Sequence, residues 1–61
     1  MGKTVRQIRQ AKGLSQAEVA KRAGLSREYI NKIEAGKYDP SLSTINALAA
    51  ALGVTARRLM G

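Results

Sequence analysis

The sequence predicts an all-α fold, a compact five-helix bundle that uses residues 1–61 as a single domain. Five segments repeat apolar residues every three or four positions, which is the spacing of one helix face. Glycine follows each of the first four segments, and serine or threonine precedes each of the last four. These residue types commonly end and begin helices. A chain of 61 residues has room for one thin core, so we expect tight helix packing.

The first helix is expected from Thr4 to Lys12, with Val5 and Ile8 on its apolar face. Gly13 then ends it. One interpretation of the basic residues along or beside this helix is a solvated surface: Lys3, Arg6, Arg9 and Lys12. An alternative for Arg9 is given below.

The second helix is expected over residues 16–23. Ser15 and Glu18 have the spacing of a capping box, in which each residue binds the backbone amide of the other. Gly24 follows the last apolar position, where glycine adopts a left-handed backbone without strain. Small residues at a spacing of three suggest a face that packs closely against a neighbouring helix: Ala17, Ala20 and Ala23.

The third helix is expected at about residues 26–35, with Ser26 as its cap and Gly36 after its end. The link to the second helix is too short for an antiparallel arrangement, so the two helices should cross steeply as a helix-turn-helix. Ile30 and Ile33 mark the core side. The opposite face is polar and can donate and accept hydrogen bonds.

A polar loop, residues 37–41, leads to a fourth helix that begins at Ser41 or Ser43 and ends before Gly53. Its core stripe is expected to contain Leu42, Ile45, Leu48, Ala49 and Leu52. Thr55 can cap a last short helix, which carries Leu59 and Met60 near the end of the sequence.

Charge and composition favour a polyanionic partner. Eleven Lys and Arg residues outnumber four Asp and Glu residues and give a net charge of +7, and nine of the eleven lie between Lys3 and Lys37. Cysteine and histidine are absent, which excludes a disulfide framework and the commonest metal sites, so we expect no metal or cofactor. Without a signal peptide or long apolar run, the protein is expected to be soluble and cytoplasmic, with no membrane contact. The four scattered carboxylates offer no catalytic arrangement, so we do not expect an enzyme.

The segment GLSQAEVAKRAGLSREYINKIEAGKYDPSL and the later ALGV resemble the lambda-repressor-like helix-turn-helix family, also called Cro/C1 or XRE. The likeness covers nearly the whole chain. It implies sequence-specific binding of double-stranded DNA by a transcriptional regulator, a repressor above all, as a homodimer on inverted half-sites about one helical turn apart. No small-molecule ligand is expected. The alternative is a protein-interaction module on the same fold, such as an antitoxin or adaptor domain.

By this resemblance, the third helix enters the major groove, and Arg27, Glu28 and Lys32 fall at base-reading positions. Arg and Lys donate to guanine O6 and N7, whereas Glu accepts from cytosine N4. Asn31 is a further candidate for a base or a phosphate. A simpler interpretation pairs Glu28 with Lys32, because they are four positions apart on one helix.

Contacts with DNA phosphates are expected from Ser15, Gln16, Ser26, Tyr29 and Lys37. In the resembling family a glutamine at the position of Gln16 binds the DNA backbone at the positive end of the second helix. Tyr29 and Lys37 have alternatives, since Tyr29 can pack against the core and Lys37 can remain solvated.

The resemblance also pairs Arg9 with Glu34 in an ion pair between the first and third helices. For Leu59 and Met60 two interpretations remain open: they close the core of their own chain, or they contact a second copy, as the same region does in related proteins.

Overall fold

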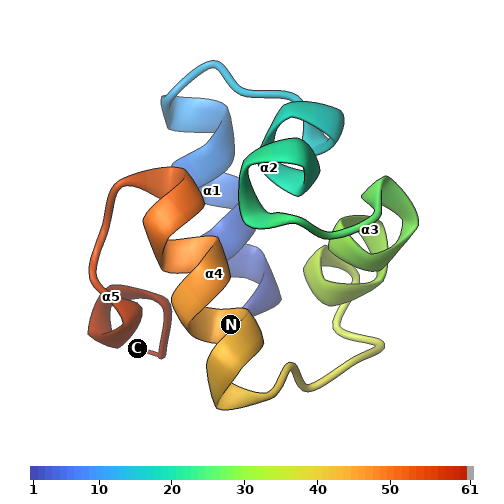
Figure 1. Cartoon of the computed structure of the whole chain (residues 1–61), viewed down its shortest axis with the longest axis vertical. Coiled ribbons are helices and arrows are strands. Elements are labelled where there is room, and N and C mark those ends of the chain that lie inside the picture. Colours follow the sequence, from blue (N-terminus) through green and yellow to red (C-terminus); the bar gives the residue numbers. More distant parts are fainter. Residues whose placement is uncertain (61) are drawn as a thin grey trace.

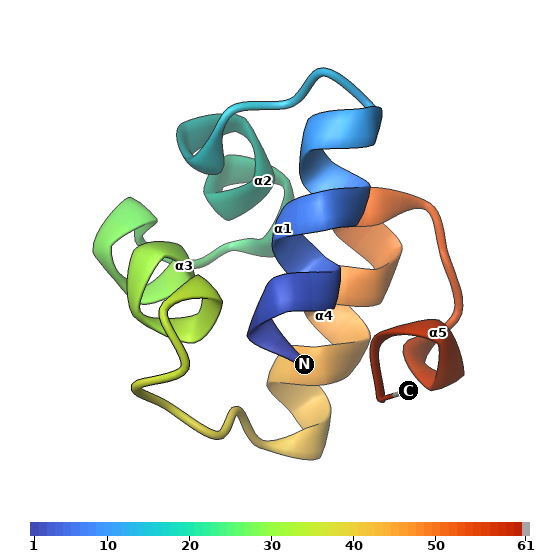
Figure 2. The same cartoon turned by 180° about the vertical axis from the view of Figure 1, so that it is seen from behind.

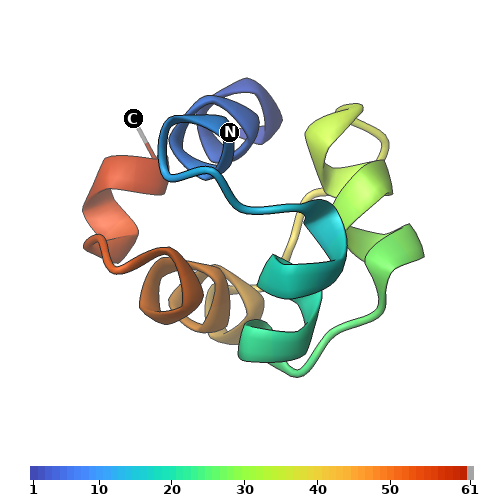
Figure 3. The same cartoon turned by 90° about the horizontal axis from the view of Figure 1, so that it is seen from above.

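The computed structural model describes residues 1–60 and contains five α-helices in that range. They are α1 (Gly2–Ala11), α2 (Gln16–Ala23), α3 (Arg27–Glu34), α4 (Leu42–Leu52) and α5 (Ala56–Met60). Helices α1 and α4 occupy the middle of the molecule, with α3 on one side and α5 on the other (Figures 1, 2 and 3). The five helices confirm the predicted all-α fold class.

None of the described helices is long and apolar enough to span a lipid bilayer.

The local signals at the ends of the helices work as the sequence suggests. Ser15 and Glu18 form the complete capping box of α2. The hydroxyls of Ser26 and Ser41 accept hydrogen bonds from backbone amides in the first turns of α3 and α4. Gly24 and Gly53 have φ angles of 71° and 69° and end α2 and α4 in the left-handed conformation.

Helix α1 starts earlier than predicted, at Gly2 rather than Thr4, and ends at Ala11. The prediction rested on the apolar spacing of Val5 and Ile8, which does not mark where the helix begins, and α1 has no side-chain cap. The Met1 carbonyl instead accepts the Val5 amide at 3.0 Å, which closes the first helical turn over residues 1–5. Helix α3 spans 27–34, because Ser26 and Ala35 are its caps rather than helical residues.

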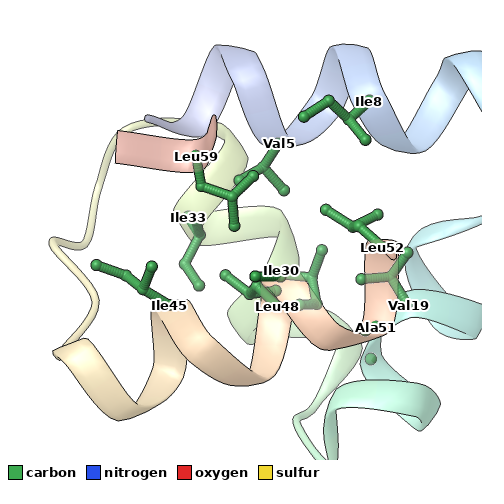
Figure 4. Packing of buried hydrophobic residues seen from close by; sticks show 12 residues of the cluster. Val5, Ile8, Val19, Ile30, Ile33, Ile45, Leu48, Ala51, Leu52 and Leu59 are labelled. Atoms are coloured by element: carbon green, nitrogen blue, oxygen red, sulfur yellow. The ribbon is translucent and has the colours of Figure 1, made fainter. Parts of the chain in front are cut away.

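All five helices contribute side chains to one core, most of which is drawn in Figure 4. Its members are Val5, Ile8, Val19, Ala20, Ile30, Ile33, Ile45, Leu48, Ala49, Ala51, Leu52 and Leu59. Leu59 is completely buried, and Figure 4 shows it pointing into the same cluster as Val5 and Ile33. Leu59 therefore closes the core of its own chain, and its side chain is not available to a second copy. Met60 is 59% exposed.

Two expectations about core faces were wrong. Ala17 is exposed, and the buried face of α2 instead combines Val19 and Ala20 with the partly buried Ala23. The packing partners of α2 thus select a face rotated from the alanine stripe. Leu42, the first residue of α4, is 64% exposed, so the buried stripe begins at Ile45.

The start of α1 packs directly on the end of α3. A Cβ atom at Gly2 would collide with the carbonyl oxygen of Ile33 and lie 3.0 Å from that of Glu34. Only glycine permits this approach. It brings the positive end of the α1 dipole to the negative end of α3, an electrostatically favourable arrangement.

We expect Gly2→Ala to destabilise the domain. Alanine is a better helix residue than glycine by about 1 kcal/mol, so a helix without tertiary contacts would gain stability. Here the obstacle is backbone, and overpacking of this kind typically costs about 1–3 kcal/mol. Thermal unfolding should therefore show a melting temperature lowered by about 4–8 °C per kcal/mol. The control, Lys3→Ala, changes an exposed residue of the same turn and should melt like the wild type. A higher melting temperature for Gly2→Ala than for the wild type would contradict this, because it would mean that α1 can shift away from α3 at no cost in stability.

Candidate nucleic-acid interface

The outward face of α3 presents the four residues expected to read bases. Arg27, Glu28, Asn31 and Lys32 are all exposed. A guanidinium nitrogen of Arg27 lies 3.9 Å from a carboxylate oxygen of Glu28. The contact is between two exposed side chains, so it contributes little stability and can exchange for a ligand. The alternative pairing of Glu28 with Lys32 is not formed within the described chain.

The aromatic residue of α3 has a mixed environment. The Tyr29 side chain packs partly against the core, which agrees with one of its two expected roles. Its ring also contacts Tyr38 from the following loop, with the centroids 5.5 Å apart. Lys37 is exposed in this loop, and its amide donates to the Lys32 carbonyl at 2.9 Å. The loop therefore folds back along the end of α3.

The start of α2 meets α1 and α3 around a polar pocket of about 210 Å³. Its lining residues are Arg6, Arg9, Gln16, Asn31, Glu34 and Ala35. The Gln16 side-chain amide donates to Glu34 Oε1 at 3.2 Å, which fixes one end of this side chain. The first amides of α2 have no acceptor within the helix and give this end a positive dipole. The pocket thus places the exposed cation of Arg6 near the positive end of α2.

Arg6 is exposed, as expected, and it also lines this pocket, which the sequence did not predict. The available signal was its spacing: Arg6 lies three positions before Arg9, so both residues share one helix face. Ser15 and Ser26 are exposed caps whose hydroxyl oxygens already accept backbone amides. Each hydroxyl hydrogen remains a possible donor to a phosphate.

The capping box also affects a titration. The hydrogen bond from the Ser15 amide to Glu18 Oε1, 3.0 Å long, lowers the pKa of the Glu18 carboxyl, and the Ser15 hydroxyl contributes in the same direction. A group with a lowered pKa in the folded state stabilises that state above its ordinary pKa, and the contribution is lost as the pH falls through the lowered value. The cap of α2 is therefore fully formed at neutral pH.

Arg9 and Glu34 form the expected ion pair. Arg9 Nε lies 2.7 Å from Glu34 Oε2, and Nη2 lies 3.0 Å from Oε1, a bidentate arrangement. The third donor, Nη1, reaches the Leu14 carbonyl at 2.9 Å. The side chains are only 12% and 4% exposed. The hydrogen bonds to Glu34 raise the pKa of Arg9, so this guanidinium is always charged.

Comparison with known proteins identifies the family to which this five-helix domain belongs. A family model described as helix-turn-helix matches residues 5–59, from the first helix to the last. The chain belongs to the Cro/C1-type (XRE) helix-turn-helix family. This is a family of DNA-binding transcriptional regulators rather than enzymes.

Individual relatives agree with this assignment. The helix-turn-helix chain is 41% identical over 61 residues to the immunity repressor protein of Bacillus phage phi105. That match covers 100% of the chain but 42% of the relative, so the chain spans less than half the length of this repressor.

Solved structures of this family superimpose closely. The restriction-modification controller protein C.AhdI from Aeromonas hydrophila gives a TM-score of 0.93 at 43% identity, over 95% of this chain and 88% of that one. SinR is described as the master regulator for biofilm formation and was solved in complex with DNA. Its structure gives a TM-score of 0.92 at 31% identity, over 98% of this chain and 97% of the SinR chain.

We expect Glu34→Gln to destabilise the helix-turn-helix domain strongly. The substitution removes the charge that compensates the largely buried Arg9, and breaking a buried pair costs about 3–5 kcal/mol. Circular dichroism should record a melting temperature lowered by well over about 10 °C. The matched control is Glu28→Gln, which changes an exposed glutamate of the same helix and should leave the melting temperature nearly unchanged. Equal melting curves for Glu34→Gln and wild type at several pH values would refute this role of the pair.

Proposed function

We propose that this domain binds double-stranded DNA at specific sequences, with α3 in the major groove, and acts in a transcriptional repressor. The observation that carries the proposal is the outward face of α3. It exposes two cations, a carboxylate and an amide, whereas Ile30 and Ile33 on the opposite side are buried. Arg27 and Lys32 suit guanine, Glu28 suits cytosine, and the amide of Asn31 can both donate and accept.

Phosphates on either side of the groove would be bound by residues that flank α3. On one side, the pocket at the start of α2 offers Gln16 and Arg6 beside the positive end of that helix. Ser15 is available as a donor at the same helix end. On the other side, Ser26, the hydroxyl of Tyr29 and Lys37 are candidates. Phosphate contacts on both sides of α3 would fix its register in the groove.

The proposed working form is a homodimer on inverted half-sites. A single domain of this size makes few contacts, and a pair bound about 34–36 Å apart reads one face of the duplex twice. Met60 remains a candidate for the contact between copies, because its side chain is exposed at the end of α5. The likeness to a phage immunity repressor supports repression as the outcome.

A binding selection from a randomised duplex library, at near-physiological salt, tests this function. We expect enrichment of an inverted repeat, because two identical reading helices impose two-fold symmetry on the site. Enrichment of one half-site would contradict the dimer but support base reading. If weak binding without enrichment disappears as salt rises, the charge acts non-specifically. That outcome would favour the protein-interaction module over the repressor.

Arg27→Ala should weaken binding to the selected site by about 1–3 kcal/mol, the value of one bidentate base contact, and should affect random duplex far less. Titrations on both duplexes measure the difference. The matched control is Arg6→Ala, which should weaken binding to both duplexes alike and reduce the salt slope by about 1. An equal loss on both duplexes with Arg27→Ala would reclassify Arg27 as a phosphate contact.

Glu28→Ala should relax sequence preference more than it lowers affinity. A carboxylate close to phosphates is repelled unless it meets a donor such as cytosine N4, so Glu28 acts mainly by rejecting other bases. The measurement is the affinity for the selected site and for its single-base variants. A uniform loss of affinity across all these sequences would contradict this role.

A further inference from the structure

Tyr38 lies in the loop between α3 and α4, outside the set of side chains assigned to DNA. Gly36 has a positive φ of 75°, and the adjacent Lys37 amide donates to the Lys32 carbonyl. The chain therefore turns directly after α3. Beyond this turn, the ring of Tyr38 lies beside the side chains of Tyr29 and Lys32.

Two contacts define the position of the Tyr38 ring. Its plane is tilted by 57° relative to the Tyr29 ring at a centroid distance of 5.5 Å, a favourable aromatic arrangement. Lys32 Nζ lies 5.3 Å from the Tyr38 centroid, within the range of a cation–π interaction. Since Tyr29 packs against the core, a continuous row runs from the core through both rings to the Lys32 ammonium.

We propose that Tyr38 is a positioning residue that holds Lys32 for base reading, an inference that rests on the proposed function of α3. A free lysine side chain populates many rotamers and loses most of this freedom when its ammonium binds a base edge. The ring restricts the rotamers before DNA arrives. It contacts one side of the ammonium and leaves N–H donors for guanine O6 or N7. The preference read by Lys32 therefore depends on a residue outside α3.

The test compares Tyr38→Leu, which removes the ring, with Tyr38→Phe, which keeps it. Binding is measured on the duplex selected by the wild type and on its single-base variants. Lys32→Ala identifies the base pair that Lys32 reads. We expect Tyr38→Leu to reduce the preference at that pair about two- to fivefold, the size of an exposed cation–π contact, and Tyr38→Phe to retain it. Adding Tyr38→Leu to Lys32→Ala should cause no further loss, because both changes remove the same interaction.

Other binding outcomes overturn the inference. If Tyr38→Leu and the wild type have the same base profile, Tyr38 does not position Lys32, although the proposed function stands. If both Tyr38 variants lose affinity uniformly on all duplexes, with the salt slope unchanged, the neutral Tyr38 hydroxyl is a phosphate contact instead. If Tyr38→Leu strengthens the preference, the ring competes with DNA for the ammonium. If the wild type selects no sequence, the proposed function fails and this inference fails with it.

NMR of the free protein provides a readout that does not depend on DNA. The ring current of Tyr38 should shift the Lys32 side-chain methylene protons upfield in the wild type and in Tyr38→Phe, but not in Tyr38→Leu. A wild-type spectrum without this shift overturns the inference whatever the binding data show. Tyr38 is 48% exposed, so both variants should fold, and their melting temperatures check this directly.

Discussion

The ion pair between Arg9 and Glu34 holds the recognition helix α3 in its place. Glu34 lies at the end of α3 and accepts hydrogen bonds from α1 through Arg9 and from α2 through Gln16. Arg9 also binds the Leu14 carbonyl in the link between α1 and α2. Buried ion pairs contribute little net stability, but their hydrogen bonds are directional and satisfy each other here. Ile30 and Ile33 fix the core side of α3, and the polar network adds directional contacts at its end.

Backbone contacts reinforce the same position. Gly2 allows the start of α1 to touch the last carbonyl groups of α3, and the loop after Gly36 returns along the same end of the helix. The end of α3 is thus held by α1, by α2 and by its own following loop. Its start depends on the Ser26 cap and the short link from α2. This asymmetry leaves the first turn, with Arg27 and Glu28, as the more open part of the reading face.

The features that the sequence predicted are those encoded within a few residues. The capping box of Ser15 and Glu18, the glycine ends of α2 and α4 and the buried Ile30 and Ile33 depend on local spacing. The ion pair of Arg9 with Glu34 required the family resemblance, because 25 positions separate its partners. The early start of α1, the exposure of Ala17 and Leu42, and the position of Tyr38 depend on which helices or loops meet. Such long-range contacts leave no periodic signal in the sequence.

The domain combines the buried ion pair of Arg9 and Glu34 with an exposed face of α3 whose side chains are weakly held. Removing either partner of the ion pair leaves a buried charge, so neither side chain can leave the pair to contact DNA without destabilising the fold. The contact between Arg27 and Glu28 is exposed and worth at most about 1 kcal/mol, so both side chains can leave it for bases. Lys32 differs from both, because the Tyr38 ring contacts its ammonium without using a hydrogen-bond donor. In the proposed complex, Arg27 and Glu28 would therefore leave their mutual contact, whereas Lys32 would meet the duplex in the conformation that the free protein already holds.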